Sequence, residues 1–158
     1  IRGTPVVVQL MIMYYIILSP MNLSEITVAV LAFGVNSGAY VAEVVRSGIQ
    51  SVDRGQTEAG RSLGLSAKTT MVKIVFPQAL KNVLPAIGNE FIALLKETSV
   101  AGYIGIQDLT KGGDIVRSIT YLRFTPLILT ALIYLVIVVA LSALLTRFER
   151  RLHRSDYR

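Results

Sequence analysis

Polar and charged residues recur at helical spacing within an apolar part of this chain. Asn82, Asn89 and Lys96 are seven residues apart, and so are Glu90 and Glu97. Because seven residues make about two turns of an α-helix, these side chains would share one stripe. Ionisable groups inside a membrane are costly and usually face a cavity or a partner. An ammonium group and two carboxylates on one stripe could therefore bind a ligand that carries both charges.

Two structural explanations compete with ligand binding at this stripe. Glu90 could pair with Lys96, or the side chains of Lys96 and Glu97 could reach the outer membrane interface by snorkelling. A helix of about 15 residues from Asn82 rises about 22 Å, which places Lys96 anywhere between mid-depth and the outer edge of a bilayer. The sequence leaves these explanations open.

The composition is that of a membrane protein and excludes several kinds of active site. Of the 158 residues, 53% are hydrophobic and 16% are charged, whereas about a quarter of the residues in a soluble domain are charged. The absence of cysteine excludes disulfides, thiolate zinc sites and cysteine nucleophiles. The single histidine, His153, excludes a multi-histidine metal site. We therefore predict no metal site and no catalytic residue in this chain.

Four segments are candidates for membrane spans, which need about 20 mostly apolar residues. They cover residues of about 5–18, 26–45, 82–97 and 124–146. The last is the clearest because it contains no charged residue, while the third carries the polar stripe. The sequence thus predicts an all-α integral membrane protein, with one domain over residues 1–158 and four transmembrane helices.

The distribution of Lys and Arg predicts the orientation of these spans. Cytoplasmic loops are enriched in both residues. With Arg2, the loop 46–81 and the basic C-terminal tail inside, twelve of the 16 Lys and Arg residues are cytosolic and three lie in outer loops. The loop 46–81 is therefore predicted to be cytosolic. In the outer part, residues 111–114 are expected to form a turn.

The cytosolic stretch GQTEAGRSLGLSAKTTMVKIVFPQA, residues 55–79, has the pattern of two short helices joined by a hinge. The first helix is expected over about 57–63, and Gly64 can end it in a left-handed conformation. Ser66 can cap the second helix. Pro77 is expected to bend the chain back toward the bilayer.

Two other functions of this stretch are excluded by its spacing and surroundings. A helix-turn-helix DNA reader needs a compact three-helix core and a free recognition helix, whereas here both flanks enter the membrane within a few residues. A Walker phosphate loop needs Gly-Lys-Ser/Thr after a strand, but Ala67 precedes Lys68 and no strand is predicted. We expect no nucleic-acid partner and no nucleotide bound by this chain.

The same stretch resembles the cytosolic EAA loop of ABC importer permeases. The motif residues are Glu58, Ala59 and Gly60, then Gly64, then Ile74 and Pro77, at the intervals of that family. Gly60 stands where the family usually has alanine, which is expected to loosen the helix. The stretches IRGTPVVVQL, NSGAYVAEVVRSGIQSV and FPQALKNVLPAIGNEFIALLKETSV are similar to the polar amino acid branch. Members typically have five spans, so the resemblance implies that a first span is missing before Ile1.

The resemblance implies which residues couple this chain to an ATPase. The motif positions carried over are Glu58, Ala59, Gly60, Gly64, Ile74 and Pro77, and the charge of Arg61 adds it to the predicted coupling residues. Glu58 and Arg61 can make charge-assisted contacts to the ATPase. Leu63 and Leu65 offer apolar contacts to the same surface.

The resemblance also implies an assembly. Two permease subunits, identical or different, pair among the lipids of the bacterial cytoplasmic (plasma) membrane, and two cytosolic ABC ATPases bind beneath them. The ATPases bind ATP-Mg and hydrolyse the ATP. This chain itself is therefore expected to have no enzymatic activity and to bind no cofactor. An extracytoplasmic binding protein, or a binding domain fused upstream, delivers the substrate. Glutamine or another polar amino acid is expected, with arginine or histidine next.

Under this resemblance the polar stripe becomes a candidate translocation pathway. Asn89, Glu90, Lys96 and Glu97 could meet the ammonium and carboxylate groups of an amino acid. One alternative function is transport of another substrate by the same architecture. Another is a membrane scaffold or sensor whose cytosolic loop binds a regulatory protein without transport.

Overall fold

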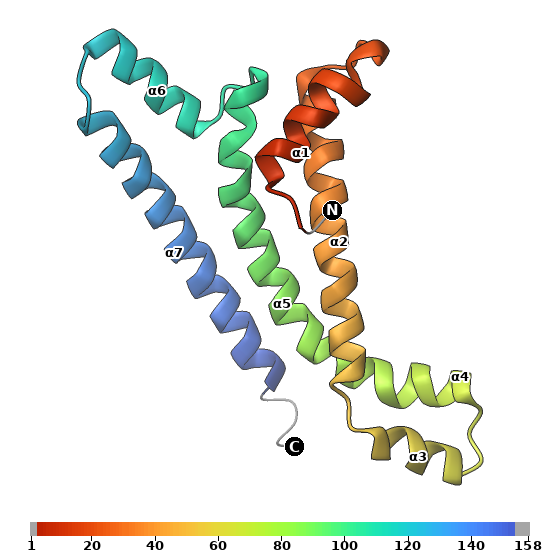
Figure 1. The fold of residues 1–158 in the computed structure, drawn as a ribbon. Coiled ribbons are helices and arrows are strands. Elements are labelled where there is room, and N and C mark those ends of the chain that lie inside the picture. The colour runs from red at the N-terminus through yellow and green to blue at the C-terminus, as the bar shows by residue number, and fades with distance from the viewer. Residues whose placement is uncertain (1–2, 154–158) are drawn as a thin grey trace. The chain divides into compact units, whose positions relative to one another are not determined.

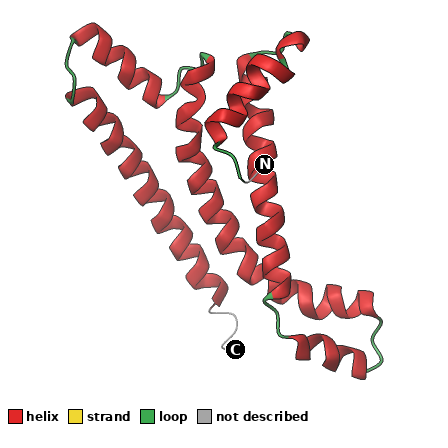
Figure 2. Cartoon of the chain, in the orientation of Figure 1, coloured by secondary structure: helices red, strands yellow, loops and turns green. Residues whose placement is uncertain are grey.

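The computed structural model describes residues 3–153, which form helices and short links with no strand among them. Residues 1, 2 and 154–158, including the end of the predicted basic tail, lie outside the described residues. The α-helices are α1 (Val6–Ile12), α2 (Glu25–Gln50), α3 (Arg54–Ser62), α4 (Ala67–Thr70), α5 (Phe76–Glu97), α6 (Leu109–Thr120) and α7 (Thr125–His153) (Figure 1, Figure 2). Shorter turns join them: π turns at Met13–Ile17 and Met71–Val75, and 3-10 turns at Ser19–Met21 and Thr98–Ile104.

Three of the predicted spans lie within longer helices. The second, third and fourth segments fall almost entirely inside α2, α5 and α7, which extend beyond them. By length and composition, Glu25–Gln50 and Thr125–Arg150 could each cross a membrane, whereas Val6–Ile17 is apolar but shorter. Helices are the expected solution in lipid because they satisfy the backbone N–H and C=O groups within one segment.

The chain forms two compact units. The first comprises the described part of Ile1–Ala39 together with Phe91–Ala143. The second comprises Tyr40–Glu90 together with the described part of Leu144–Arg158. Each of α2, α5 and α7 therefore contributes one part to the first unit and another part to the second.

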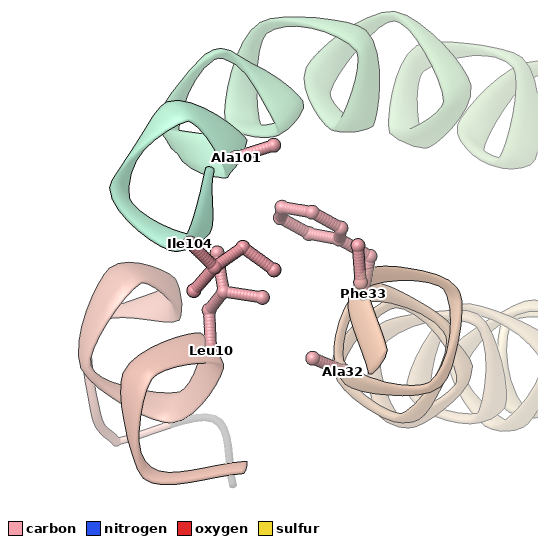
Figure 3. Close-up of a cluster of buried hydrophobic side chains, with 6 residues drawn as sticks. Leu10, Ala32, Phe33, Ala101 and Ile104 are labelled. Carbon is pink, nitrogen blue, oxygen red and sulfur yellow. The ribbon is translucent and has the colours of Figure 1, made fainter. Parts of the chain in front are cut away.

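The core of the first unit is a cluster of apolar side chains from three segments. It contains Leu10 of α1, Ala29, Ala32 and Phe33 of α2, and Ala101 and Ile104 of the 3-10 turn. Leu10 is fully buried, and Figure 3 shows Leu10, Phe33 and Ile104 converging on one space. The small alanines allow the helices to approach closely, so the larger side chains can fill the space between them.

In the second unit, the end of α2 packs closely on the beginning of α5. Gly48 is buried, and a Cβ atom at this position would clash with Val83 Cγ2. Beside this contact, Asn82 Nδ2 donates a hydrogen bond to Ser51 Oγ (2.9 Å), and Ser51 Oγ donates to Gly48 O (2.8 Å). Packing and hydrogen bonds thus join the two helices where they flank the stretch that contains α3 and α4.

The prediction of a turn at residues 111–114 is wrong, because these residues lie within α6. Asp108 caps this helix, and its Oδ1 accepts a hydrogen bond from the Lys111 N–H (2.7 Å). Two adjacent glycines suggested a turn, but Gly113 packs against α7, where a Cβ atom would clash with Thr130 Oγ1. This tertiary contact outweighs the poor helix propensity of glycine.

Gly113→Ala is expected to destabilise the protein, whereas Gly112→Ala is not. Overpacking a close contact costs about 1–3 kcal/mol, while nothing lies within 4 Å of a Cβ atom added at Gly112. Alanine also improves helix propensity by up to about 1 kcal/mol at either position. Thermal unfolding of the detergent-solubilised protein should show a lower midpoint for Gly113→Ala alone. Equal midpoints for the two variants would contradict the close contact between α6 and α7.

Candidate functional site

The stretch 55–79, predicted to be cytosolic, folds into a hairpin of α3 and α4 that is closed by backbone hydrogen bonds. Leu65 N–H donates to Gly60 O (3.2 Å), and Gly64 N–H donates to Arg61 O (3.0 Å). Gly64 has a φ of 79°, in the left-handed region. Two such bonds around a left-handed residue form the Schellman motif. The predicted helix end at Gly64 is therefore confirmed.

Both helices of the hairpin begin with a side-chain cap. Asp53 Oδ1 accepts a hydrogen bond from Gly55 N–H (2.7 Å), and α3 consequently begins about one turn before its predicted start. Ser66 Oγ accepts from Thr69 N–H (3.1 Å), which confirms the predicted cap of α4. Because each cap stabilises a helix by about 1 kcal/mol, both arms of the hairpin have defined starts.

The hairpin continues into α5 through a π turn. Phe76 N–H donates to Met71 O, five residues earlier. Pro77 follows at the beginning of α5, where it removes one N–H donor and crowds the carbonyl four residues before it. Figure 1 shows the chain changing direction between α4 and α5, as predicted from Pro77. The accompanying π turn was not predicted.

Gly60, the buried residue of α3, packs closely on the chain that follows it. A Cβ atom at this buried position would lie 2.8 Å from Thr70 Cγ2 and 2.9 Å from Ile74 Cδ1. Thr70 is only 1% exposed, and its Oγ1 donates to Ser66 O (3.0 Å), which restricts its movement. The missing Cβ lets Thr70 and Ile74 close on α3, so close packing accompanies the low helix propensity of glycine at this position. The expected loosening relative to alanine stays a prediction.

The other predicted coupling residues lie on the outside of the hairpin or at its edge. Glu58, Ala59, Arg61, Gly64 and Pro77 are exposed, and Ile74 is half-buried. Of the two leucines expected to meet a partner, Leu63 is 80% exposed, whereas Leu65 is half-buried. The structure thus divides the predicted set: Gly60 and Ile74 close the hairpin, and the exposed residues remain available to another surface.

The predicted pathway residues fall in both units, with Asn89 and Glu90 in the second and Lys96 and Glu97 in the first. Asn89 Nδ2 donates to Pro85 O (3.0 Å), so its amide is engaged with its own helix. Glu97 Oε2 is buried and accepts no hydrogen bond from residues 3–153. A buried carboxylate oxygen without a donor is unfavourable. Glu97 is therefore a group that a ligand or a partner could satisfy.

Lys96 lines a cavity of about 260 Å³ between the end of α5, α6 and α7. The other lining residues are Ser99, Thr110, Leu127, Thr130, Ala131 and Tyr134. The hydroxyls of Thr110 and Tyr134 share a hydrogen bond (3.2 Å). None of these polar residues was predicted from the sequence, although Thr130 and Tyr134 are four residues apart and share one face of the apolar α7.

Comparison with known proteins identifies the same kind of protein as the EAA spacing of the hairpin. The family model for binding-protein-dependent transport system inner membrane components matches residues 1–154. The chain belongs to this family. Membership confirms the predicted resemblance to ABC importer permeases and the predicted all-α membrane fold.

Individual relatives are named as amino acid permeases. The arginine transport system permease protein ArtQ of Bacillus subtilis (strain 168) is 40% identical over 157 residues, covering 98% of this chain and 72% of that protein. The glutamine transport system permease protein GlnP of Escherichia coli (strain K12) is 37% identical over 155 residues, covering 96% and 71% respectively. A crystal structure of an amino acid ABC transporter with histidines is 50% identical, covers 95% of this chain and 71% of that one, and has a TM-score of 0.90.

Gly60→Ala is expected to push the packed parts of the hairpin apart, and adding Thr70→Ser is expected to restore them in part. Serine lacks the Cγ2 methyl that the new Cβ would meet, but it keeps the hydroxyl that bonds Ser66 O. We expect Gly60→Ala to lower the stability of the solubilised permease by about 1–3 kcal/mol, less any gain in helix propensity. The double variant should recover part of this loss in thermal unfolding, because the contact with Ile74 Cδ1 remains. A more stable Gly60→Ala would show that the neighbours yield and that propensity dominates.

Proposed function

We propose that this chain is the permease subunit of an ATP-driven importer of polar amino acids in the bacterial cytoplasmic membrane. The observation that carries the proposal is the closed hairpin of α3 and α4, which has the EAA spacing and exposes Glu58 and Arg61. Membership of a transport family supports import. The names of ArtQ and GlnP, for arginine and glutamine, support a polar amino acid as the substrate.

The hairpin is the proposed docking site for a cytosolic ABC ATPase. Glu58 and Arg61 can form charge-assisted hydrogen bonds with the ATPase, and the exposed Leu63 supplies an apolar contact. The hairpin is joined to α2 by a three-residue link and to α5 by the π turn. A movement of the docked ATPase would therefore reach both helices. ATP-Mg and its hydrolysis belong to the ATPase, and this chain catalyses no reaction.

The proposed translocation pathway follows the polar residues of α5. Lys96 can bind the carboxylate of an amino acid and Glu97 its ammonium group, and the buried Glu97 oxygen that lacks a donor supports this role. Asn89 and Glu90 lie nearer the beginning of the same helix. A second permease subunit, identical or different, completes the membrane part. A binding protein or a fused binding domain delivers the amino acid from outside.

Reconstitution in liposomes tests this function. The full-length permease is combined with its ATPase and its binding protein, and the binding protein is loaded with glutamine, arginine or histidine. We expect the loaded binding protein to stimulate ATP hydrolysis several-fold and to drive uptake of the amino acid. If it neither stimulates hydrolysis nor supports uptake, the chain is not an importer permease.

In the same liposomes, Gly64→Val and Gly64→Asn test whether coupling requires the left-handed backbone conformation of Gly64. Nothing lies within 4 Å of a Cβ atom added at Gly64, so the backbone alone determines the cost of a substitution. The left-handed conformation costs a typical side chain about 1–2 kcal/mol, and asparagine tolerates it better than valine. Gly64→Val should hydrolyse ATP without uptake, whereas Gly64→Asn should retain most uptake. Equal uptake by the two variants would contradict a role of this hinge in coupling.

Glu97→Gln and Lys96→Met are expected to reduce uptake by about tenfold or more each, the effect of losing one hydrogen bond to a charged group. Glu25→Gln removes an exposed carboxylate at the start of α2 and serves as the control, with uptake unchanged. Initial uptake rates over a range of substrate concentrations provide the measurement. Unchanged kinetics in both pathway variants would assign these residues to packing.

A further inference from the structure

Two adjoining cavities in the first unit share the side chains of Ser99 and Thr110. The first is the cavity of about 260 Å³ that contains Lys96. The second, of about 230 Å³, is lined by Ser99, Gly102, Tyr103, Thr110, Lys111 and Asp114. Since a water molecule takes about 30 Å³ of liquid volume, the second cavity has space for a free amino acid.

Lys111 is held in position at the wall of the second cavity. The backbone N–H of Lys111 donates a hydrogen bond to Asp108 Oδ1 in the first turn of α6 (2.7 Å). A Cβ atom on Gly102 would lie 3.3 Å from Lys111 Cβ, so this glycine allows the 3-10 turn to approach the lysine side chain. Within residues 3–153, neither Lys111 nor Lys96 forms an ion pair. Two lysines that form no ion pair thus line adjoining cavities.

The second cavity combines both signs of charge with neutral hydrogen-bonding groups. Lys111 supplies a cation and Asp114 an anion, and Ser99 and Thr110, which carry hydroxyl groups, line the shared wall. Arg117 Nη2 contacts Asp114 Oδ1 (2.7 Å), which orients the Asp114 carboxylate. A zwitterionic amino acid presents the complementary carboxylate and ammonium groups, and charge-assisted hydrogen bonds to such groups are strong.

We infer that the second cavity is an outer binding station for the transported amino acid. Lys111 and Ser99 hold the α-carboxylate, and Asp114 holds the ammonium group. The substrate then passes the wall shared at Ser99 and Thr110 to reach Lys96. This inference rests on the proposed function. It also rests on the orientation with a cytosolic loop 46–81, which places the end of α5 on the side where substrate arrives.

Lys111→Gln and Lys111→Arg test the station in the reconstituted transporter. Uptake from saturating loaded binding protein is expected to fall about tenfold or more in Lys111→Gln, because one charge-assisted hydrogen bond is lost. Lys111→Arg keeps the cation and should remain close to the wild type. Arg123→Gln removes an exposed cation from the link between α6 and α7, which lines neither cavity, and should also resemble the wild type.

A thiol in the shared wall gives a second readout that does not depend on uptake. Because the chain contains no cysteine, Ser99→Cys introduces one thiol into the permease. Glutamine, arginine or histidine, whichever the wild type transports, should slow its modification by a cationic methanethiosulfonate several-fold in the solubilised complex. The corresponding amine without a carboxylate should protect much less. Ser118→Cys, exposed on α6 outside both cavities, should react equally with and without the amino acid.

The outcomes separate the station from the importer function. If the wild type transports an amino acid but Lys111→Gln transports it equally well, the station is wrong and the importer function stands. Equal modification of Ser99→Cys with and without that amino acid would also overturn the station. If the wild type transports none of the three amino acids, the proposed function and the station fail together.

Discussion

The hydrogen bond from Leu65 N–H to Gly60 O closes the hairpin on which the proposed coupling role depends. It requires the left-handed Gly64, and it accompanies the packing of Thr70 and Ile74 against the bare backbone of Gly60. Because its parts are packed as well as hydrogen-bonded, the hairpin is a stiff element rather than a loop. A stiff element between two long helices transmits a displacement, whereas a flexible loop of equal length would absorb it.

Features of the hairpin that depend on adjacent residues could be predicted from the sequence. The left-handed Gly64 and the Ser66 cap follow from local backbone chemistry. The packing at Gly60 could not be predicted, because helix propensity describes α3 alone and not the Thr70 side chain that approaches it. The turn expected in α6 failed for the same reason, since the contact of Gly113 with α7 decides that conformation.

The polar residues show a second limit of sequence spacing. Periodicity predicted one stripe along α5, but Asn89 bonds to the carbonyl of Pro85 in its own helix, whereas Glu97 has a buried oxygen without a donor. The hydrogen bond between Thr110 and Tyr134 joins two helices, so no spacing rule within either helix could identify it. A few hydroxyl and charged groups are therefore enough to bring polar atoms into a cavity between helices once the helices pack.

The π turn at Met71–Val75 determines the rotational phase of the helix that follows it. A turn whose hydrogen bond spans five residues instead of four accommodates one additional residue. Since each residue of an α-helix advances by about 100° around the axis, the side chains of α5 are rotated relative to those of an uninterrupted helix. An insertion or deletion between Gly64 and Pro77 would therefore change which face α5 presents as well as the length of the connection. The number of residues in this interval is a geometrical requirement of the same kind as the identity of a motif residue.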